Sequence, residues 1–583
     1  MKTGSKWRLL FGIGLLAVLF APAALDASTY SWTNIAGGRF DGAGNWNPAG
    51  PPGTNDFALF LNNRPARYTV TFSGDSSVTN KTKRLQFRND KVEFDIGDSG
   101  GVASYDAGNF LYATNDNDDY GDLLISRGAF VCGQVYGGDG YGTLARIALT
   151  GTNTTWTVKD YFMLNGNRGE CYLTVSNGAR LTASASNGGY NLRYPSTPYD
   201  CHAISMGDSS DTQIGGVLVV TGTNSSVTLT NATTYFRGRN ARFYVLDKAT
   251  ATFDSLYCEG GAGTQLRVDD ASFSVKALSL KTVAAQFKNS TITCTGDLII
   301  DLYGASPCSC TVDASVVTAS GNFTVGDAGT ATLIITNGGV LSLTKTTPTV
   351  SFPNNQTAKA RIEITGPNSR LSIARIRVGG GFSSMTGKKS AVMRVADGGL
   401  LVQRGNSAND LAVLTTGTLI LDLGTVSNGA TVVVQGLLLG SGTIVNSVDM
   451  NYATATNRPG NALAAGVLGI GGSYTQSLGV LELDIGGTTP GSGYDVLSVT
   501  NRVVISGGAI KIAALSGFKP SSGVSTYDVV TGSSISTNGA TITLPPAADG
   551  VKWSAAVVTL AGGRTAFRVS SEVRSRGTLL MVR

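Results

Sequence analysis

The side chains best suited to bind a metal ion stand in one acidic stretch with the sequence NDNDDYGD. Its residues Asp116, Asp118 and Asp122 partly match the spacing of a calcium-binding loop, in which side-chain oxygens from alternate residues surround the ion. The fifth position is Tyr120, however, and the twelfth is Arg127, where a bidentate glutamate belongs. A solvated loop is the simpler interpretation, and a calcium site at the three aspartates is the alternative. No other cofactor is expected.

Few residues have the chemistry for catalysis. His202 is the single histidine, so any Ser-His-Asp or Cys-His arrangement must use it, and its context, DCHAIS, lacks the glycines of a nucleophile elbow. The aspartate pairs at 118–119 and 269–270 lack the local motifs of polysaccharide hydrolases. Stacking of distant segments still allows two carboxylates to meet across a groove. The sequence therefore favours a protein that is not an enzyme and leaves polysaccharide cleavage open.

The seven cysteines are spaced irregularly, which is not the pattern of a zinc ribbon or of a disulfide framework. Cys308 and Cys310 form the one tight pair, with Cys294 nearby as a third thiol. A free cysteine behaves as a small hydrophobic residue. We therefore expect most of these side chains to be buried in the interior of the protein.

The overall composition is typical of strands and turns. Glycine contributes 76 of the 583 residues and charged residues only 14%, and Thr, Ser, Asn and Val supply much of the rest. A chain of this length is long enough for several ordinary domains or for one elongated array of repeats. Internal repeats decide between these two organisations.

Two short phrases recur along the chain. The three copies of the first phrase are LTGTNTTWTV, VTGTNSSVTL and ITGPNSRLSI, which begin at Leu149, Val220 and Ile364. Each copy is followed, 26 to 32 residues later, by a strand-turn-strand phrase whose turn lies at Asn177, Asp247 or Asp397. No helical pattern separates the units, so they form one array.

The strand-turn-strand phrase has the alternation of a half-buried strand. In YLTVSNGARLTA, Leu173 and Val175 face one side, the pair Asn177 and Gly178 turns the chain, and Leu181 resumes the pattern. Glycine and asparagine accept the positive φ of such a corner. One unit cannot bury its own apolar face, but stacked units enclose a continuous core.

The sequence therefore predicts an all-β protein, a parallel β-helix or β-solenoid with β caps at its two ends. Trp156, Val227 and Leu371, at an apolar position of the first phrase that varies in size, are then interior residues of different rungs. The expected organisation is an N-terminal cap in residues 28–100, a solenoid repeat region in 101–457 and a C-terminal β region in 458–583.

Residues 1–27 are typical of a secretory signal peptide, with a basic start, an apolar run from Leu9 to Phe20 and small residues after it. The run is too short to cross a membrane, and no later segment is longer. We expect an exported protein, extracellular or at the cell surface, without a membrane span. Removal of the signal lowers the formal net charge from +6 to +4. This mild, dispersed charge argues against a nucleic-acid partner.

The repeats resemble those of autotransporter-like passenger proteins and related secreted bacterial surface proteins. The resemblance continues from Arg458 to Ile512, with a Pro-Gly-Asn turn at 459–461, the strand GSYTQ and the strand YDVLSV. The amino end, with its GNWN turn around Trp46, looks like the opening module of those proteins. One feature departs from the pattern, because no series of lipid-facing barrel strands follows the passenger-like region. How the protein attaches to a surface stays open.

This resemblance implies an extracellular structural or adhesive protein whose partner is a glycan or a cell surface. The alternative is a β-helix that binds or cleaves polysaccharide. Ladders of outward Thr, Ser and Asn side chains would favour adhesion. A lateral groove lined with aromatic rings and clustered charged residues would favour an enzyme.

Overall fold

The computed structural model describes the residue ranges 27–74, 80–97, 103–112, 119–137, 143–164, 170–184, 204–206, 215–281, 283–301, 307–326, 329–345, 350–351, 359–379, 390–407, 410–461, 463–515, 517–547 and 550–573. Except for Ala27, the predicted signal peptide lies outside these ranges. Within them the chain is almost entirely strand and turn, and the helical structure is one short 3-10 turn, η1 (Ala43–Asn45). No helix in the described ranges has the length and apolarity that a membrane crossing requires.

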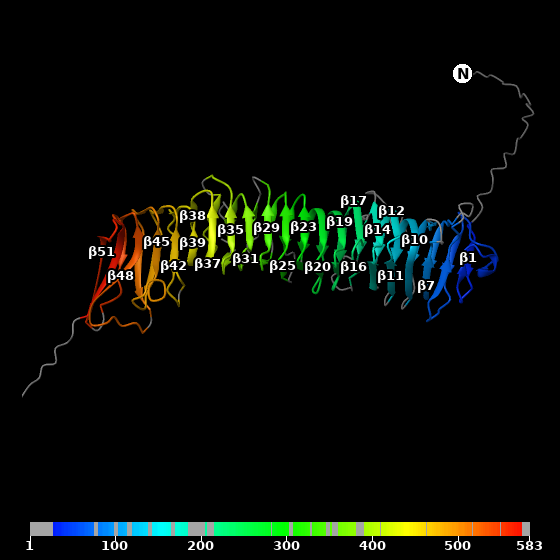
Figure 1. The fold of residues 1–583 in the computed structure, drawn as a ribbon, viewed down its shortest axis with the longest axis horizontal. Coiled ribbons are helices and arrows are strands. Elements are labelled where there is room, and N and C mark those ends of the chain that lie inside the picture. Colours follow the sequence, from blue (N-terminus) through cyan, green and yellow to red (C-terminus); the bar gives the residue numbers. More distant parts are fainter. Residues whose placement is uncertain are drawn as a thin grey trace, which may run out of the picture.

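The strands stack along one axis into a long rod (Figure 1). Successive turns of the chain pair in parallel along three faces, which confirms the predicted all-β, parallel β-helix architecture. The chain enters the rod through β1 (Thr29–Trp32), β2 (Gly38–Arg39), β3 (Trp46–Asn47), β4 (Phe57–Phe60), β5 (Tyr68–Thr71) and β6 (Arg84–Phe87).

Each face is a ladder of short strands, and several longer strands run through a corner from one face to the next. The first face contains β7 (Asp90–Asp95), β11 (Leu144–Thr150), β13 (Glu170–Ser176), β16 (Val217–Thr221), β18 (Arg242–Leu246), β20 (Gln265–Asp269), β22 (Ala284–Lys288), β25 (Cys308–Asp313), β28 (Thr330–Thr336), β31 (Lys359–Thr365), β34 (Ser390–Ala396), β41 (Thr456–Pro459), β44 (Val480–Ile485), β47 (Ala509–Ala514) and β50 (Thr541–Thr543). The second face contains β8 (Ser104–Asp106), β14 (Arg180–Ser184), β23 (Thr291–Cys294), β26 (Val316–Ala319), β29 (Val340–Leu343), β32 (Arg370–Ile373), β35 (Leu400–Gln403), β42 (Val467–Ile470), β45 (Val496–Val499) and β48 (Gly523–Gly532).

The third face contains β9 (Asn109–Tyr112), β15 (Ile204–Met206), β24 (Leu298–Asp301), β27 (Phe323–Val325), β30 (Val350–Ser351), β33 (Ile376–Val378), β36 (Leu411–Val413), β38 (Val432–Val434), β40 (Val448–Met450), β43 (Tyr474–Gln476), β46 (Arg502–Ile505) and β49 (Ser534–Ser536). The strands that run through corners are β10 (Tyr120–Gly137), β12 (Thr154–Leu164), β17 (Ser226–Arg237), β19 (Thr250–Glu259), β21 (Ser272–Lys281), β37 (Gly417–Asn428) and β39 (Leu437–Ile444).

Side chains at equivalent positions of successive rungs form columns inside the rod. Trp156 pairs in register with Leu181 and Leu181 with Val227, and the same column reaches Leu371 further along the stack. The three repeat positions Trp156, Val227 and Leu371 are fully buried. They are therefore interior residues of different rungs, as the sequence predicted.

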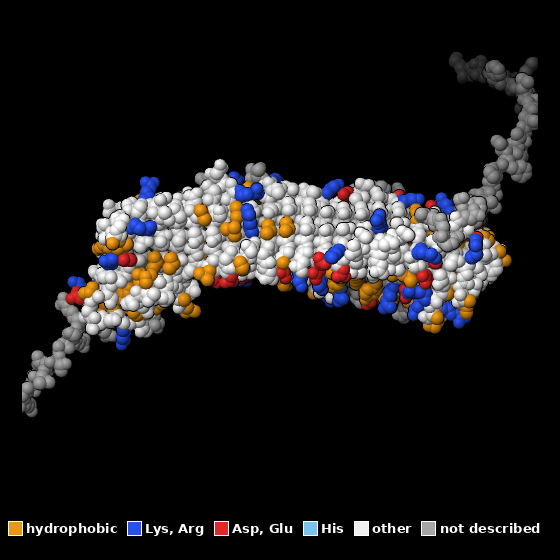
Figure 2. Space-filling model, viewed as in Figure 1, with side chains coloured by type: hydrophobic (Ala, Val, Ile, Leu, Met, Phe, Trp, Pro, Cys, Tyr) orange, Lys and Arg blue, Asp and Glu red, His pale blue; other side chains and the backbone are white. Residues whose placement is uncertain are grey.

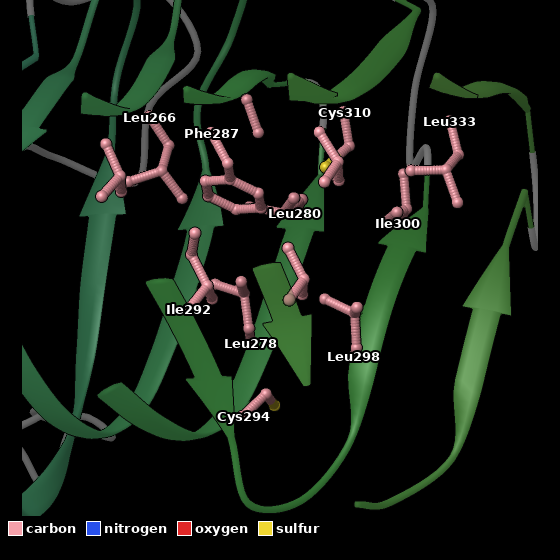
Figure 3. Packing of buried hydrophobic residues seen from close by; sticks show 14 of the residues in the cluster. Leu266, Leu278, Leu280, Phe287, Ile292, Cys294, Leu298, Ile300, Cys310 and Leu333 are labelled. Carbon is pink, nitrogen blue, oxygen red and sulfur yellow. The ribbon is translucent and has the colours of Figure 1, made fainter. Parts of the chain in front are cut away.

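The predicted inward register of the strand-turn-strand phrase is also confirmed. Leu173, Val175 and Leu333 are fully buried, whereas Thr174 faces outward and is half-buried. Figure 3 shows the interior near the middle of the rod, where Leu266, Cys310 and Leu333 line one side of the packed core. Cysteine here occupies a position that small or apolar residues occupy in the neighbouring rungs, because register places Ala285 and Leu333 on either side of Cys310.

The corners have the backbone geometry that the turn residues predicted. The positive φ of Asn177 (54°) and Gly178 (84°) turns the chain between β13 and β14. Asp247 and Asp397 have similar φ values of 55° and 50°. Such conformations disfavour most side chains, which explains why asparagine, aspartate and glycine recur at these corners.

The two ends of the rod differ from its parallel middle. At the amino end, β1 pairs in parallel with β4 and antiparallel with β3. At the other end, β48 pairs antiparallel with β52 (Thr565–Val573), which in turn pairs with β51 (Val551–Thr559). The ladders run without a break from β39 into β41 and β42, across the predicted boundary at residue 458. Whether the ends act as caps stays a prediction.

Candidate functional site

The predicted calcium loop is described only in part. Asp116 and Asp118 lie outside the described residues. Asp122 lies in β10, and its carboxylate forms an ion pair with Arg67, with 2.5 Å between Oδ1 and the guanidinium Nη2. No group of three or more His, Cys, Asp or Glu side chains in the described ranges is arranged to hold a metal ion. The calcium site stays a prediction.

Asp119, from the same acidic stretch, is buried and contacts residues of the preceding rung. It is almost fully buried, and its carboxylate lies 2.9 Å from the Nε of Arg88. The side-chain amide of Asn89 donates to its other oxygen at 2.9 Å. This aspartate therefore ties the entry to β10 to the preceding rung.

The thiols behave as the sequence predicted. The six described cysteines, Cys132, Cys171, Cys258, Cys294, Cys308 and Cys310, are buried and not joined in disulfides. Burial raises the pKa of the Cys132 thiol to about 12 and also raises that of Cys310. Neutral thiols of this kind are poor nucleophiles and poor metal ligands. Cys201 and His202 lie outside the described residues.

A regular array of hydroxyl groups covers part of the second face. It arises from the repeated phrase itself, because the residues on either side of each buried position point outward. Around Trp156 these are Thr155 and Thr157, and around Val227 they are Ser226 and Thr228. Successive rungs place such residues in two adjacent rows, which we call the hydroxyl columns.

Register defines the members of the hydroxyl columns. The second column is a run of Thr and Ser alone, consisting of Thr157, Thr182, Thr228, Thr252, Ser274, Thr293, Thr318, Ser342 and Ser372. The first column is Thr155, Arg180, Ser226, Thr250, Ser272, Thr291, Val316, Val340 and Arg370. The densest part of the array therefore spans the rungs from Ser226 to Thr293.

The array has a fixed geometry because it is built on a sheet. Neighbours within a column are one strand spacing apart, ~4.8 Å, and the columns are separated by two residues along each strand, roughly 6.6 Å. Threonine is stiff at χ1, which limits the directions that its hydroxyl can take. The array therefore offers a ligand a repeating pattern of hydrogen-bond donors and acceptors.

The hydroxyls of the second column are free to bind other molecules. From Thr157 to Ser342, they have no hydrogen-bond partner in the part of the chain that the structure describes. Ser372, at the far end, is 5% exposed and does not contribute to the open surface. The rest of the column is half-buried or exposed, so a ligand can reach it.

The first face carries charge where the second face carries hydroxyls. Arg394 lies between Glu363 and Asp422 of the neighbouring rungs and pairs with both. Further along the rod, Arg458 pairs with Glu482 at 2.7 Å. Figure 2 shows the difference, because the surface over the row of β14, β23 and β29 is mostly white and charged side chains gather along the lower margin of the rod.

The sequence contained the signal for the hydroxyl columns. In TTWTV, SSVTL and SRLSI, the apolar position is flanked on both sides by polar residues, which are mostly Thr or Ser. These copies predict the buried position and the corner. The columns themselves require the register that joins one rung to the next, including rungs outside the three copies of the phrase.

Comparison with known proteins adds no relative. No protein-family model matches the chain, and no curated protein matches it. The function is therefore inferred from the architecture and from the hydroxyl columns.

Proposed function

We propose that this protein is an extracellular structural or adhesive rod that contacts a neutral, hydroxyl-rich polymer through the hydroxyl columns. Three features support export and an adhesive role. Residues 1–27 are typical of a signal peptide, the repeats resemble autotransporter-like passengers, and the interior is a long β-helical stack. The observation that carries the proposal is the unbroken run of outward Thr and Ser from Thr157 to Ser342.

The chemistry of the columns favours a neutral polysaccharide as the partner. Hydroxyl groups both donate and accept hydrogen bonds, and they match the hydroxyls of sugar rings without requiring a charge on either side. One hydroxyl contributes little, but many act together when the polymer and the array both repeat. A flat binding face of this kind suits an extended chain or the surface of a fibre.

The proposal is tested by changing four threonines of the second column, Thr157, Thr228, Thr252 and Thr293, to valine. Valine keeps the shape and the strand preference of threonine and removes the hydroxyl. We expect the mature protein to sediment with an insoluble neutral polysaccharide, such as cellulose or chitin, and the fourfold variant to remain in the supernatant.

A matched control keeps the chemistry and moves it to another face. Thr174, Thr311, Thr332 and Thr418 are half-buried, outward threonines of the first face. Changing these four to valine should leave sedimentation unchanged. Equal loss in both variants would show that binding does not depend on the hydroxyl columns, and no sedimentation of the parent would contradict the proposed function.

Cleavage of a polysaccharide is the alternative, and it would require two carboxylates on either side of the bound chain. A cleft at the C-terminal end of the rod is lined by residues of β47, β50 and β51, and the charged side chains among its described lining residues are the lysines Lys511 and Lys519. This cleft therefore favours binding over hydrolysis.

A further inference from the structure

A cleft of about 630 Å³ opens at the C-terminal end of the rod, away from the hydroxyl columns. One wall comes from β47 and the loop after it, with Phe518 and Pro520, and the other from the residues around Pro545 and from the start of β51, with Trp553. Figure 2 shows orange side chains gathered at this end of the rod. The size and the mostly apolar walls are those of a small-ligand site.

The two aromatic rings that line the cleft pack against a third ring, which is buried. Tyr527 is fully buried, and its ring lies 6.4 Å from the ring of Phe518 and 6.1 Å from that of Trp553, measured between centroids. Phe518 and Trp553 are only partly buried, so each ring also faces the cleft. Because one buried ring supports both, the two walls are formed before a ligand arrives.

The charge in the cleft has one sign. Among the described residues that line it, the charged ones are Lys511 and Lys519. The Nζ of Lys511 lies 3.9 Å from an oxygen of Glu482, whose other oxygen pairs with Arg458 at 2.7 Å. Lys519 is exposed and has no ion pair within the described residues. The ammonium group of Lys519 is therefore available to an anion, and that of Lys511 has only the long contact with Glu482. No carboxylate is among the described residues that line the cleft.

We propose that this cleft binds an anionic sugar unit of a polysaccharide, a uronate or a sulfated sugar. The apolar face of the sugar ring packs against Trp553 and Phe518, and its carboxylate or sulfate group approaches Lys511 and Lys519. This is a second site beyond the proposed contact of the hydroxyl columns with a neutral polymer. A flat sugar ring with charge at its edge fits a compact cleft that has aromatic and proline walls. An acidic peptide fits it less well, because the side chains of the cleft offer few acceptors for the backbone N–H groups of a peptide.

The test uses calorimetry on the full mature chain with four probes: a short oligouronate, its methyl ester, a sulfated oligosaccharide of similar length and polyglutamate. We expect the oligouronate, the sulfated sugar or both to bind, with an affinity that falls as salt is added, because the contact is partly ionic. The methyl ester, which has the same rings without the charge, should not bind. Binding of polyglutamate as tight as that of the sugars, or no binding of either anionic sugar, would overturn the proposal.

Variants locate the binding in the cleft. Lys519→Gln and Lys511→Gln should each weaken the Kd roughly tenfold, which is the size expected for loss of a charged hydrogen bond. Lys552→Gln is the matched control, because Lys552 is an exposed lysine of β51 outside the cleft. It should leave the Kd unchanged. Equal weakening in all three variants would show that the anion responds only to the net charge of this end.

The two proposals fail separately. The fourfold valine variant of the second column should bind the anionic sugar as the parent does, and Lys519→Gln should sediment with the neutral polysaccharide as the parent does. Loss of sugar binding in the valine variant would show that the cleft and the columns are not independent sites, which would overturn the assignment of a second site.

Discussion

The hydroxyl of Thr221 donates a hydrogen bond to the carboxylate of Asp247 in the next rung, with 2.6 Å between Oγ1 and Oδ2. Thr365 and Asp397 form the same bond at 2.9 Å. In the first copy the direction is reversed, and the side-chain amide of Asn177 donates to the hydroxyl of Thr150 at 2.8 Å. The two repeated phrases of the sequence therefore meet at one corner, one turn of the solenoid apart.

Breaking this corner bond should destabilise the rod locally. We expect Thr221→Val to lower the local free energy of opening by about 1 kcal/mol, because one exposed hydrogen bond is lost and the side-chain shape is kept. Amide hydrogen exchange in β16 and β18 measures this local stability. Thr228→Val is the control, since its hydroxyl has no partner in the described structure, and it should change exchange very little.

The sequence was sufficient to predict the repeated features of the fold and insufficient for its single features. Alternation marked Leu173 and Val175 as inward, and Asn177 marked a corner, because strand period and positive φ are local properties. The register that stacks Trp156, Val227 and Leu371 in one column followed from repetition. In contrast, Asn457 occupies an interior column between Leu438 and Leu481 and is fully buried. No local sequence pattern predicts a buried polar residue at this position.

The cleft could not be predicted for a related reason. Lys511, Phe518, Pro545 and Trp553 come from separate segments, and they meet only because β51 and β52 fold back antiparallel against β48. This antiparallel pairing occurs once in the described structure, so no repeated sequence pattern predicts it. In the acidic stretch a local pattern predicted a calcium site, and the structure describes Asp122 alone of its three aspartates, paired with Arg67. The calcium site is therefore untested.

The interior positions tolerate charge poorly. Leu173→Asp or Leu333→Asp should lower stability by several kcal/mol, because each places an unpaired carboxylate in a closed apolar stack. Thr174→Asp, on the outward side of the same strand, should cost less than about 1 kcal/mol. Thermal melts followed by circular dichroism compare the three variants. Equal shifts for Leu173→Asp and Thr174→Asp would mean that the strand register is wrong.

The stability of the rod should depend on pH through Asp495. Its carboxylate is fully buried and accepts bonds from the N–H groups of Gly466 (2.8 Å) and Asp484 (2.9 Å). Burial raises the pKa of Asp495 to about 7, from 3.8 for a free side chain, against the lowering effect of those two bonds and of Arg458. The folded protein therefore keeps this proton at a pH where the unfolded chain has lost it.

This difference sets the sign of the pH dependence. The contribution of Asp495 is fully present below pH ~4 and is lost as the pH rises toward 7, at roughly 1.4 kcal/mol for each pKa unit of difference. Melting temperatures of the parent and of Asp495→Asn, measured at several pH values in this window, isolate the effect. The parent should lose stability relative to the variant as the pH rises. A constant difference between the two would show that the Asp495 pKa is ordinary.

The antiparallel strands at the end of the rod should prevent end-to-end association. β52 covers the edge of β48 from Gly523 to Gly532, and an uncovered strand edge is a template for pairing with another chain. Removal of residues 550–583 exposes that edge, so the shortened protein should grow in size with concentration in light scattering while the full mature chain stays constant. Charge is then added to the bare edge by combining Val524→Lys and Thr526→Lys in the shortened chain. This variant should keep a single size, because charged edge residues oppose strand pairing. A shortened chain that stays at one size without these lysines would mean that β51 and β52 serve binding alone and do not protect the end of the stack.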